Sequence, residues 1–248
     1  KICGIICEYN PFHNGHAYHI QKAKQLSGAD FVVCIMSGNF VQRGEAAIFD
    51  KHTRAKHAFL AGADAVIELP VPFATSTAEI FAKGAIKLLN SIPSFTHLCF
   101  GAETEDAQAF YDCAKILRDE PPFVSSQIQA LTSTGMSFAK ARAKAYSDYM
   151  PSSILTKPNN ILGLEYTKAL LNANSKAEII PIQRQGSGYL ESELSKNFSS
   201  ATAIRAAIKE NRLDGIENNL PSFVLTDIDN ACLDPLDTPE KYEILSVS

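Results

Sequence analysis

The chain has 248 residues, 46% of them hydrophobic, and a formal net charge of −4. This is enough chain to bury a sizeable core in one extended domain or in two smaller ones. The acidic balance is not that of a generic nucleic-acid binder, although it leaves room for a local basic patch, and no run of about 18 apolar residues is present to span a membrane.

The cysteines and the first residues indicate the compartment. Six cysteines lie apart from one another, mostly within apolar runs, and form no CxxC pair. This pattern is typical of reduced, buried thiols rather than of a disulfide framework or a zinc site. The apolar run in the opening stretch, KICGIICEYN, is too short for a signal peptide, because polar residues follow it after a few positions. We therefore expect a cytoplasmic protein.

The first part of the chain alternates between apolar runs and helix-like segments. The apolar runs are nearly continuous, as expected of parallel strands covered on both faces, and predict strands over 2–9, 31–38, 64–69 and 95–101. The segments between them predict helices over 16–26, 51–62 and 77–90, the second with Asp50 as N-cap and Gly62 at its end. This alternation predicts an α/β fold with an open, doubly wound parallel sheet and right-handed crossovers.

From about residue 104 the pattern becomes helical. Helices are predicted over 104–119, 123–133, 137–150 and 158–172, a strand over 177–184, and a late helix over 199–210 that Ser199 or Ser200 caps. The last forty residues contain scattered prolines and are expected to be irregular. We predict a catalytic domain over 1–205 with a helical insertion at about 104–150, followed over 206–248 by the start of a C-terminal segment.

The sequence HNGH, residues 13–16, follows the first predicted strand and opens a helix predicted to begin near Asn14. In open α/β sheets ligands bind beyond the carboxyl ends of the strands, and the free N–H groups of a helix start favour an anion. Gly15 lets the backbone approach closely, while His13 and His16 are three residues apart and so share one face. The two histidines are therefore candidates to donate hydrogen bonds to charge that develops on a phosphoryl group.

Other interpretations of this stretch are weighed by residue spacing. Histidines at a helix start often serve only as caps or surface residues, and His19 is expected to be a partly exposed helix residue. A zinc site is disfavoured, because zincin helices place histidines four apart with a glutamate between them. The chain has neither a GxxxxGK[ST] loop nor a GxGxxG sequence after a strand, which excludes a P-loop and a dinucleotide fingerprint.

HNGH after a first strand resembles the HxGH signature of the nucleotidylyltransferase superfamily. The sequence SSATAIR, residues 199–205, resembles its second signature, ISSTxxR, with Thr202 and Arg205 in place and Ala201 where a serine usually stands. Together with EYNPFHNGH, MSGNFVQRGE, FGAE and KPNNILGLEY, these blocks resemble the bacterial tRNA(Met) cytidine acetate ligase family over residues 1–205. Members of that family are usually longer than this chain.

The resemblance implies a Rossmann-like nucleotidylyltransferase fold and a two-step reaction. ATP and acetate give acetyl-adenylate and pyrophosphate, and the acetyl group then passes to N4 of the wobble cytidine in elongator tRNA(Met). Activation comes first because acetate is a poor acylating agent and the exocyclic amine of cytosine is a weak nucleophile. Mg²⁺ is expected to accompany ATP, no metal ligands are assigned, and the oligomeric state is left open.

By resemblance, His13 and His16 are catalytic, and the strip from residue 6 to residue 19 binds ATP. The other members of that strip are Ile6, Cys7, Glu8, Tyr9, Asn10, Pro11, Phe12, Asn14, Gly15, Ala17, Tyr18 and His19. Gly101, Asn159 and Arg184 are further candidates for ATP binding, with a strand-end turn at the first and helix capping at the second as alternatives. The candidate phosphate contacts are Ser200, Thr202 and Arg205.

The loop after the second strand belongs to the same edge of the sheet. Candidate contacts for acetate or the target cytidine there are Ser37, Asn39, Gln42 and Arg43. A structural loop in which Arg43 pairs with Glu45 is the alternative. Two helices are basic and are candidate tRNA contacts, because phosphate contacts supply most nonspecific affinity; a solvated charged face is the alternative. Their basic residues are Lys51, Arg54, Lys56 and His57 in the first, and Lys140, Arg142 and Lys144 in the second.

Three functions stay open at this point. The first is the acetate–tRNA ligase, and the second is a plain nucleotidylyltransferase that joins AMP or CMP to a small phosphorylated acceptor. The third is a non-catalytic nucleotide-binding or RNA-binding module. The MSGNFVQRGE and KPNNILG blocks favour the first over the second by resemblance.

Overall fold

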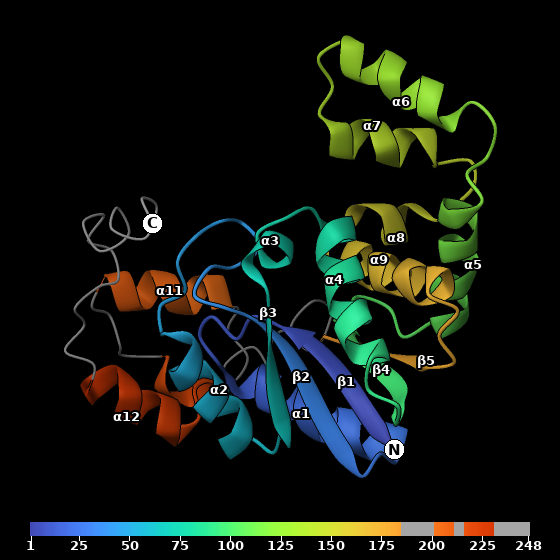
Figure 1. The fold of residues 1–248 in the computed structure, drawn as a ribbon. Coiled ribbons are helices and arrows are strands. Elements are labelled where there is room, and N and C mark those ends of the chain that lie inside the picture. The colour runs from blue at the N-terminus through green and yellow to red at the C-terminus, as the bar shows by residue number, and fades with distance from the viewer. Residues whose placement is uncertain (185–200, 211–215, 231–248) are drawn as a thin grey trace.

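The computed structural model describes residues 1–184, 201–210 and 216–230. At its centre lies a parallel sheet with the strand order β3-β2-β1-β4-β5. The strands are β1 (Ile2–Cys7), β2 (Phe31–Ser37), β3 (Ala65–Leu69), β4 (Phe95–Ala102) and β5 (Glu178–Gln183) (Figure 1). All five lie where apolar runs predicted strands. The strand order switches direction at β1 and β4, and such a point leaves a crevice beyond the carboxyl ends in which ligands bind.

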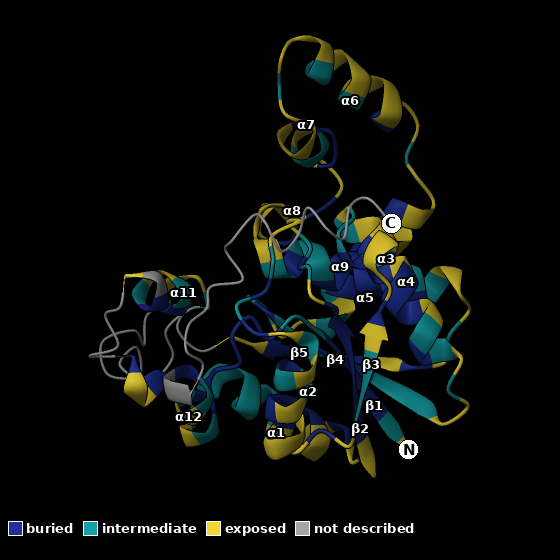
Figure 2. Cartoon of the chain, turned by 60° about the vertical axis from the view of Figure 1, so that its left-hand side comes forward, coloured by how far each residue is buried: buried dark blue, intermediate teal, exposed yellow. Residues whose placement is uncertain are grey.

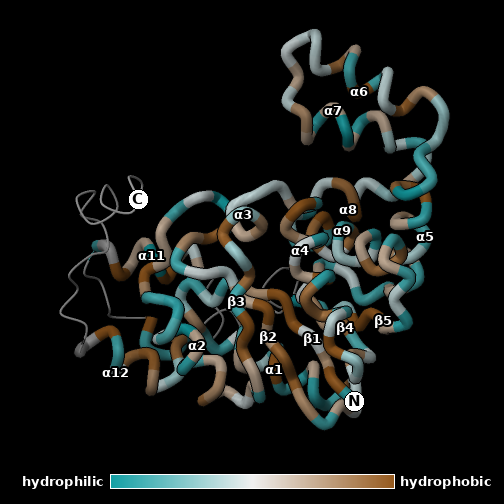
Figure 3. Tube along the Cα trace, viewed as in Figure 1, coloured by the Kyte–Doolittle hydropathy of each residue, from teal (hydrophilic) through white to brown (hydrophobic). Residues whose placement is uncertain are grey.

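Helices cover both faces of the sheet, which confirms the doubly wound α/β fold (Figures 1 and 2). One face carries α4 (Ala78–Asn90), α5 (Ala107–Arg118) and α9 (Pro158–Asn172), with the short α3 (Val71–Ala74) before α4. The other face carries α1 (Asn14–Ser27), α2 (Lys51–Leu60), α11 (Ala201–Lys209) and α12 (Ser222–Asn230). Successive strand residues point to opposite faces, so Ile5 and Ile6 of β1 enter different cores. Covered on both faces, the strands form the hydrophobic centre in Figure 3.

The helix ends follow the capping residues in the sequence. Oδ1 of Asp50 accepts hydrogen bonds from the backbone N of His52 at 2.7 Å and of Thr53 at 3.1 Å, which confirms the predicted N-cap of α2. Gly62, with φ of +104°, lies just beyond the end of this helix, and Gly28, with φ of +57°, follows α1. Both glycines adopt a left-handed backbone that other residues rarely take. In the part of the chain that the structure describes, no helix has the length and apolar character needed to cross a membrane.

The prediction that the last forty residues are irregular is wrong for residues 217–230. A short 3₁₀ helix (Glu217–Asn219) is followed there by α12. Pro221 comes directly before α12, a position where the missing backbone N–H costs nothing, so this proline starts a helix instead of breaking one. Val224 and Ile228 are four residues apart and are both buried in the core on the α1 side of the sheet. The division of domains at residue 205 stays a prediction.

Residues 124–145 form a helical arm that projects from the rest of the molecule on the side where the strands end (Figures 1 and 2). It consists of α6 (Val124–Ser133) and α7 (Phe138–Ala145), joined through Gly135 with φ of +89°. The predicted helices over 123–133 and 137–150 are thus confirmed, although the second ends at Ala145. A further short helix, α8 (Ser152–Thr156), was not predicted.

Candidate active site

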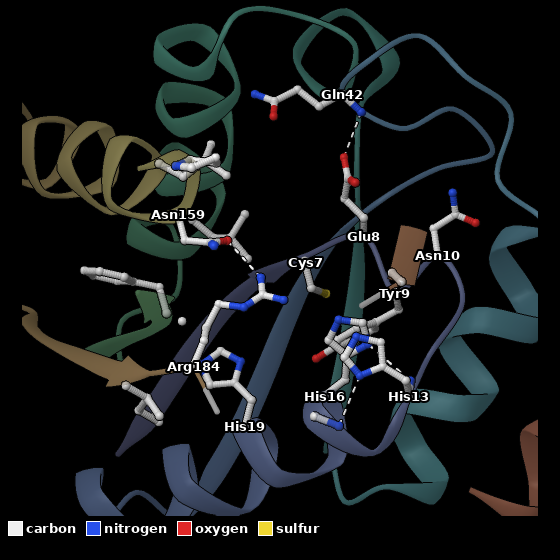
Figure 4. Close-up of a pocket in the computed structure, with 18 of the residues that line it drawn as sticks. Cys7, Glu8, Tyr9, Asn10, His13, His16, His19, Gln42, Asn159 and Arg184 are labelled. Carbon is white, nitrogen blue, oxygen red and sulfur yellow. Dashed lines mark hydrogen bonds between the residues drawn. The ribbon is translucent and has the colours of Figure 1, made fainter. Parts of the chain in front are cut away.

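A cavity of roughly 670 Å³ opens beyond the carboxyl ends of β1, β4 and β5 (Figure 4). This volume falls within the range of small-molecule and cofactor sites. The structure brings most of the predicted site residues together in its lining. They are Ile6, Cys7, Glu8, Tyr9, Asn10, His13, Gly15, His16, Tyr18, His19, Gln42, Gly101, Asn159, Arg184, Thr202 and Arg205. Their contacts with ligands stay predictions.

His13 and His16 form a stacked pair at the start of α1. His13 is the N-cap, and its Nδ1 accepts a hydrogen bond from the backbone N of Gly15 at 3.1 Å. The backbone N of His13 donates in turn to Nδ1 of His16 at 3.3 Å, and the ring centroids are 3.6 Å apart. Because both Nδ1 atoms accept from the backbone, each neutral ring carries its proton on Nε2. Nε2 of His13 is buried and has no partner among the described residues.

The cavity holds its histidines in the neutral form. Burial, followed by the nearby positive charge of Arg184, lowers the pKa of His13 and of His19 to about 4. Burial, followed by the neighbouring His13 and Arg184, also holds the pKa of His16 well below its usual range. His19 is half-buried, as predicted, and its Nε2 lies 3.4 Å from Sγ of Cys99. At neutral pH these rings are therefore hydrogen-bond donors without a charge.

The free energy of unfolding is expected to fall as the pH drops from about 6.5 towards 4. Because the folded-state pKa values of His13 and His19 lie below the ordinary 6.5, the unfolded chain binds more protons in this window. The stability that these neutral rings contribute is complete above pH 6.5 and is lost towards pH 4. Urea midpoints of the wild type and of His19→Gln between pH 7 and pH 4.5 measure it. The variant should show the shallower pH dependence, and equal slopes would contradict the assignment.

Glu103 joins the end of β4 to the start of α9. Its Oε2 accepts from the backbone N of Asn160 at 2.9 Å, and its Oε1 accepts from Nδ2 of Asn159 at 2.7 Å. Oδ1 of Asn159 accepts from Nη1 of Arg184 at 2.9 Å. A carboxylate at a helix start satisfies an N–H group and complements the helix dipole. Glu103 therefore caps α9, and the side chain of Asn159 positions Arg184 beside the cavity.

The absence of a side chain at Gly101 leaves space for the side chain of Arg184. A Cβ atom at Gly101 would lie 3.3 Å from Cγ of Arg184, which is tighter than ordinary contact. The backbone N of Arg184 donates to the backbone O of Ala102 at 2.9 Å, so this arginine continues the β4–β5 pairing past the end of β5. Glycine at position 101 thus lets the arginine stem lie against β4.

The second signature reaches the first through Arg205. Nη1 of Arg205 donates to the backbone O of Asn10 at 2.8 Å, and its Nη2 lies 3.3 Å from Oγ1 of Thr202. Nδ2 of Asn14 donates to the backbone O of Asn218 at 2.9 Å. These contacts place α11 and the 3₁₀ helix at Asn218 beside the histidine loop. Ser200, also predicted to contact phosphate, lies outside the described residues.

Four residues of the predicted ATP-binding strip do not line the cavity, namely Pro11, Phe12, Asn14 and Ala17. Phe12 is fully buried, and its ring centroid lies 4.8 Å from that of Tyr9 and 5.5 Å from that of His16. Asn14 is turned towards Asn218 instead. The strip runs from the end of β1 through a loop into α1, so some of its side chains enter the core or turn away while the others face the cavity.

The predicted contacts on the β2 loop divide in a similar way. Gln42 lines the cavity, and its backbone N donates to Oε1 of Glu8 at 2.7 Å. Ser37 is fully buried beneath the loop, so the prediction that its side chain contacts a ligand directly is wrong. Oδ1 of Asn39 accepts from the backbone N of Lys51 at 2.9 Å, ahead of α2, and neither Asn39 nor Arg43 lines the cavity.

Arg54 is a structural residue rather than part of a basic helix face. It is fully buried and, among the described residues, donates hydrogen bonds only to backbone oxygens, those of Glu8, Ser37, Gly38 and Phe49. His57 is also fully buried, and its Nε2 lies 2.9 Å from Oδ2 of Asp227 on α12. The interpretation of α2 as a basic surface for tRNA is therefore wrong for these two residues.

Arg142 is likewise engaged inside the protein. Its Nη2 forms an ion pair with Oε1 of Glu165, which is 1% exposed. Oε2 of the same carboxylate lies 2.9 Å from Nζ of Lys168. Arg142 thus neutralises a buried carboxylate and joins the helical arm to α9, which corrects its assignment as a tRNA contact. Lys140 and Lys144 are exposed on α7, as the prediction requires.

The apolar part of the cavity was not predicted from the sequence. Its lining includes Phe81, Phe100, Leu162, Tyr166 and Ile182. Phe81 lies on α4, Leu162 and Tyr166 lie on α9, and the other two lie on strands β4 and β5. Their spacing along these elements follows the same periodicity as that of core residues, so the sequence does not distinguish a cavity wall from the core. Within residues 1–184, 201–210 and 216–230 no group of three or more His, Cys, Asp or Glu side chains could hold a metal ion.

Comparison with known proteins identifies the family of this chain. The family model for HIGH Nucleotidyl Transferase matches residues 1–246. The tRNA(Met) cytidine acetate ligase of Caldanaerobacter subterraneus subsp. tengcongensis is 46% identical over 92% of this chain and 58% of its own length. The protein of the same name from Clostridium perfringens is 40% identical over 99% of this chain and 65% of its own length.

The fold also matches solved structures. The crystal structure of Thermotoga maritima TmcAL bound with alpha-thio ATP is similar with a TM-score of 0.82 and 36% sequence identity, over 92% of this chain and 56% of that chain. An apo form of the same Thermotoga maritima protein gives a TM-score of 0.81. This chain spans less than two thirds of the length of each of these relatives. The family model matches almost the whole chain, and the two histidines of HNGH line the cavity. The chain therefore belongs to the HIGH nucleotidyl transferase family.

Proposed function

We propose that this chain activates acetate with ATP and transfers the acetyl group to N4 of the wobble cytidine in elongator tRNA(Met). The observation that carries the proposal is the cavity with the stacked His13 and His16 pair at a helix start, in a chain 46% identical to a tRNA(Met) cytidine acetate ligase. A structural relative binds alpha-thio ATP in the same fold.

In the first step an acetate oxygen attacks the α-phosphorus of ATP, and pyrophosphate leaves with the electron pair. Such a displacement needs alignment and charge stabilisation more than covalent help from the protein. The Nε2–H groups of His13 and His16 donate to the phosphate oxygens on which charge develops. Arg184, held by Asn159, and Arg205, held at the loop by Asn10, supply the positive charge around the polyphosphate. Mg²⁺ is proposed to arrive with ATP.

The experiment that tests the proposal is pyrophosphate release from ATP and Mg²⁺ with and without acetate, followed by transfer of labelled acetate to bulk bacterial tRNA. Acetate-dependent pyrophosphate together with label in tRNA is the expected result. Pyrophosphate that depends on a phosphorylated acceptor but not on acetate would replace the proposal with a plain nucleotidylyltransferase. Nucleotide binding without turnover would replace it with a binding module.

We propose that the helical arm contacts tRNA through α7. Lys140 and Lys144 are exposed there, and Phe138 beside them is 65% exposed. Exposed lysines contact phosphates, and an exposed aromatic ring offers a stacking surface for an unpaired base. Arg142 is excluded from this surface by its ion pair with Glu165.

Replacing Lys140 and Lys144 together with glutamate is expected to weaken tRNA binding by about tenfold or more at low salt. The slope of log affinity against log salt should become shallower by about two, one for each lost phosphate contact. Filter binding over a salt series measures both. The matched control is the charge reversal of Lys83 and Lys87, which are exposed on α4. If both double variants weaken binding equally, the arm is not a specific contact.

A further inference from the structure

One carboxylate lines the cavity away from the cationic side chains. Glu8 directly follows β1, and Figure 4 shows its side chain reaching towards Gln42, on the opposite side of the cavity from His13 and His16. Oε1 of Glu8 accepts from the backbone N of Gln42 at 2.7 Å. Its Oε2 has no hydrogen-bond or ion-pair partner among the residues that the structure describes. The role proposed above for the ATP-binding residues leaves this oxygen unused.

The position of Glu8 is fixed from two sides. Nη1 of the buried Arg54 donates to the backbone O of Glu8 at 2.5 Å, and the loop at Gln42 holds one carboxylate oxygen. Ordering of this kind holds the second oxygen at one place in the cavity wall, which is what a proton acceptor requires.

Aromatic and aliphatic side chains line the same cavity. Phe81, Phe100, Leu162 and Tyr166 line it together with Glu8. Burial raises the pKa of the Tyr166 hydroxyl, and the negative charge of Glu8 raises it further, so the two side chains are close enough to interact. A carboxylate among aromatic groups repels phosphate and acetate. It suits a flat, uncharged base that carries an amino group.

Cytosine has this chemistry. Its N4 amine donates hydrogen bonds, and Glu or Asp is the side chain that accepts from that group in base recognition. Its ring stacks on aromatic side chains. Adenine also carries an exocyclic amine, but the groups that suit its phosphates, His13, His16 and Arg184, lie on the other side of the cavity from the Glu8 carboxylate (Figure 4).

We propose that Glu8 accepts a hydrogen bond from the N4 amine of the target cytidine and takes its proton during acetyl transfer. This inference rests on the proposed function. The amine nitrogen attacks the carbonyl carbon of acetyl-adenylate and forms the C–N bond. The bond from that carbon to the phosphate oxygen breaks, AMP leaves with the electron pair, and one amine proton passes to the Glu8 carboxylate.

The test separates formation of the adenylate from its use. Acetyl hydroxamate, formed from ATP, acetate and hydroxylamine without tRNA, reports the first step, because hydroxylamine is a stronger nucleophile and needs no base from the protein. Labelled acetyl-tRNA, formed from synthetic acetyl-adenylate in a single turnover, reports the second. The test variant is Glu8→Gln, whose amide oxygen still accepts from Gln42 while the charged oxygen is lost. The control is Glu45→Gln, an exposed carboxylate in the loop that carries Gln42.

Glu8→Gln is expected to lower acetyl transfer about 100-fold or more, the usual contribution of a general base, and to lower hydroxamate formation far less. Glu8→Asp should recover part of the transfer rate, and Glu45→Gln should behave as the wild type.

Two results would overturn the inference. Equal losses in hydroxamate and in transfer would mean that Glu8 serves the nucleotide step, and unchanged transfer would mean that it serves neither. A wild-type protein that forms hydroxamate but transfers no acetyl group from acetyl-adenylate to tRNA would refute the proposed transfer itself, and this result is distinct because it does not depend on any variant.

Discussion

Replacing His16 with alanine is expected to lower acetate-dependent pyrophosphate release by about 100- to 1,000-fold, the usual cost of removing one donor to developing charge. The Nε2–H group of His16 is proposed to strengthen its hydrogen bond as charge develops on the phosphate, so the loss should appear mainly in kcat rather than in KM for ATP. Initial rates at several ATP concentrations separate the two quantities.

The alanine variant also removes a helix cap. Nδ1 of His16 accepts from the backbone N of His13, so a loop displaced by the substitution would also lower the rate. His16→Asn serves as the second variant, because its side-chain oxygen offers an acceptor to that N–H while no donor reaches as far as the ring nitrogen did. His52→Ala, at an exposed position on α2, is the control. Rates within about twofold of the wild type in both His16 variants would show that the stacked pair is only a cap.

The sequence predicted the strands and the first half of the site because both depend on local patterns. Continuous apolar runs locate strands that are covered on both faces, and the edge at which parallel strands end is fixed by the fold class. His13 and His16 lie directly after β1 and are three residues apart, so their meeting at one helix start needed no knowledge of distant residues. Their roles as N-cap and as mutual hydrogen-bond partners emerged only with the backbone.

Residues whose partners lie far along the chain were misjudged. Arg142 pairs with Glu165 across 23 positions, and Arg54 reaches the backbone of Glu8 across 46. In the sequence both arginines occupy basic stretches, which are usually solvated faces. Helix periodicity tells which residues share a face, but not which neighbour that face meets. Glu103 was missed as the cap of α9 for the same reason, since it follows β4.

Arg54 carries the largest expected effect on stability. Beyond its bond to Glu8, the guanidinium donates to the backbone O of Ser37 at 3.2 Å and of Phe49 at 3.0 Å, and also to that of Gly38. These carbonyls belong to the end of β1, the end of β2 and the segment before α2, so one buried side chain holds the loops that border the cavity. The desolvated charge is compensated by the hydrogen bonds that the guanidinium donates to these carbonyl groups.

Arg54→Met is expected to lower the free energy of unfolding by about 3–5 kcal/mol. Each buried carbonyl that loses its donor costs roughly 1–3 kcal/mol, and the costs do not simply add, because the loops relax together and the charge no longer has to be desolvated. Urea unfolding at neutral pH measures the change. Arg118→Met, which removes an exposed arginine of α5, is the matched control and should leave the urea midpoint unchanged.

Arg54→Lys distinguishes charge from geometry. Lysine keeps the positive charge, but its single ammonium group cannot reach carbonyls on three separate segments as the planar guanidinium does. We therefore expect a loss of stability close to that of the methionine variant, accompanied by slower acetyl transfer, since Glu8 and the loop at Gln42 lose their support. A lysine variant as stable as the wild type would mean that the charge alone holds the loops, and that the individual hydrogen bonds of the guanidinium contribute little to the site.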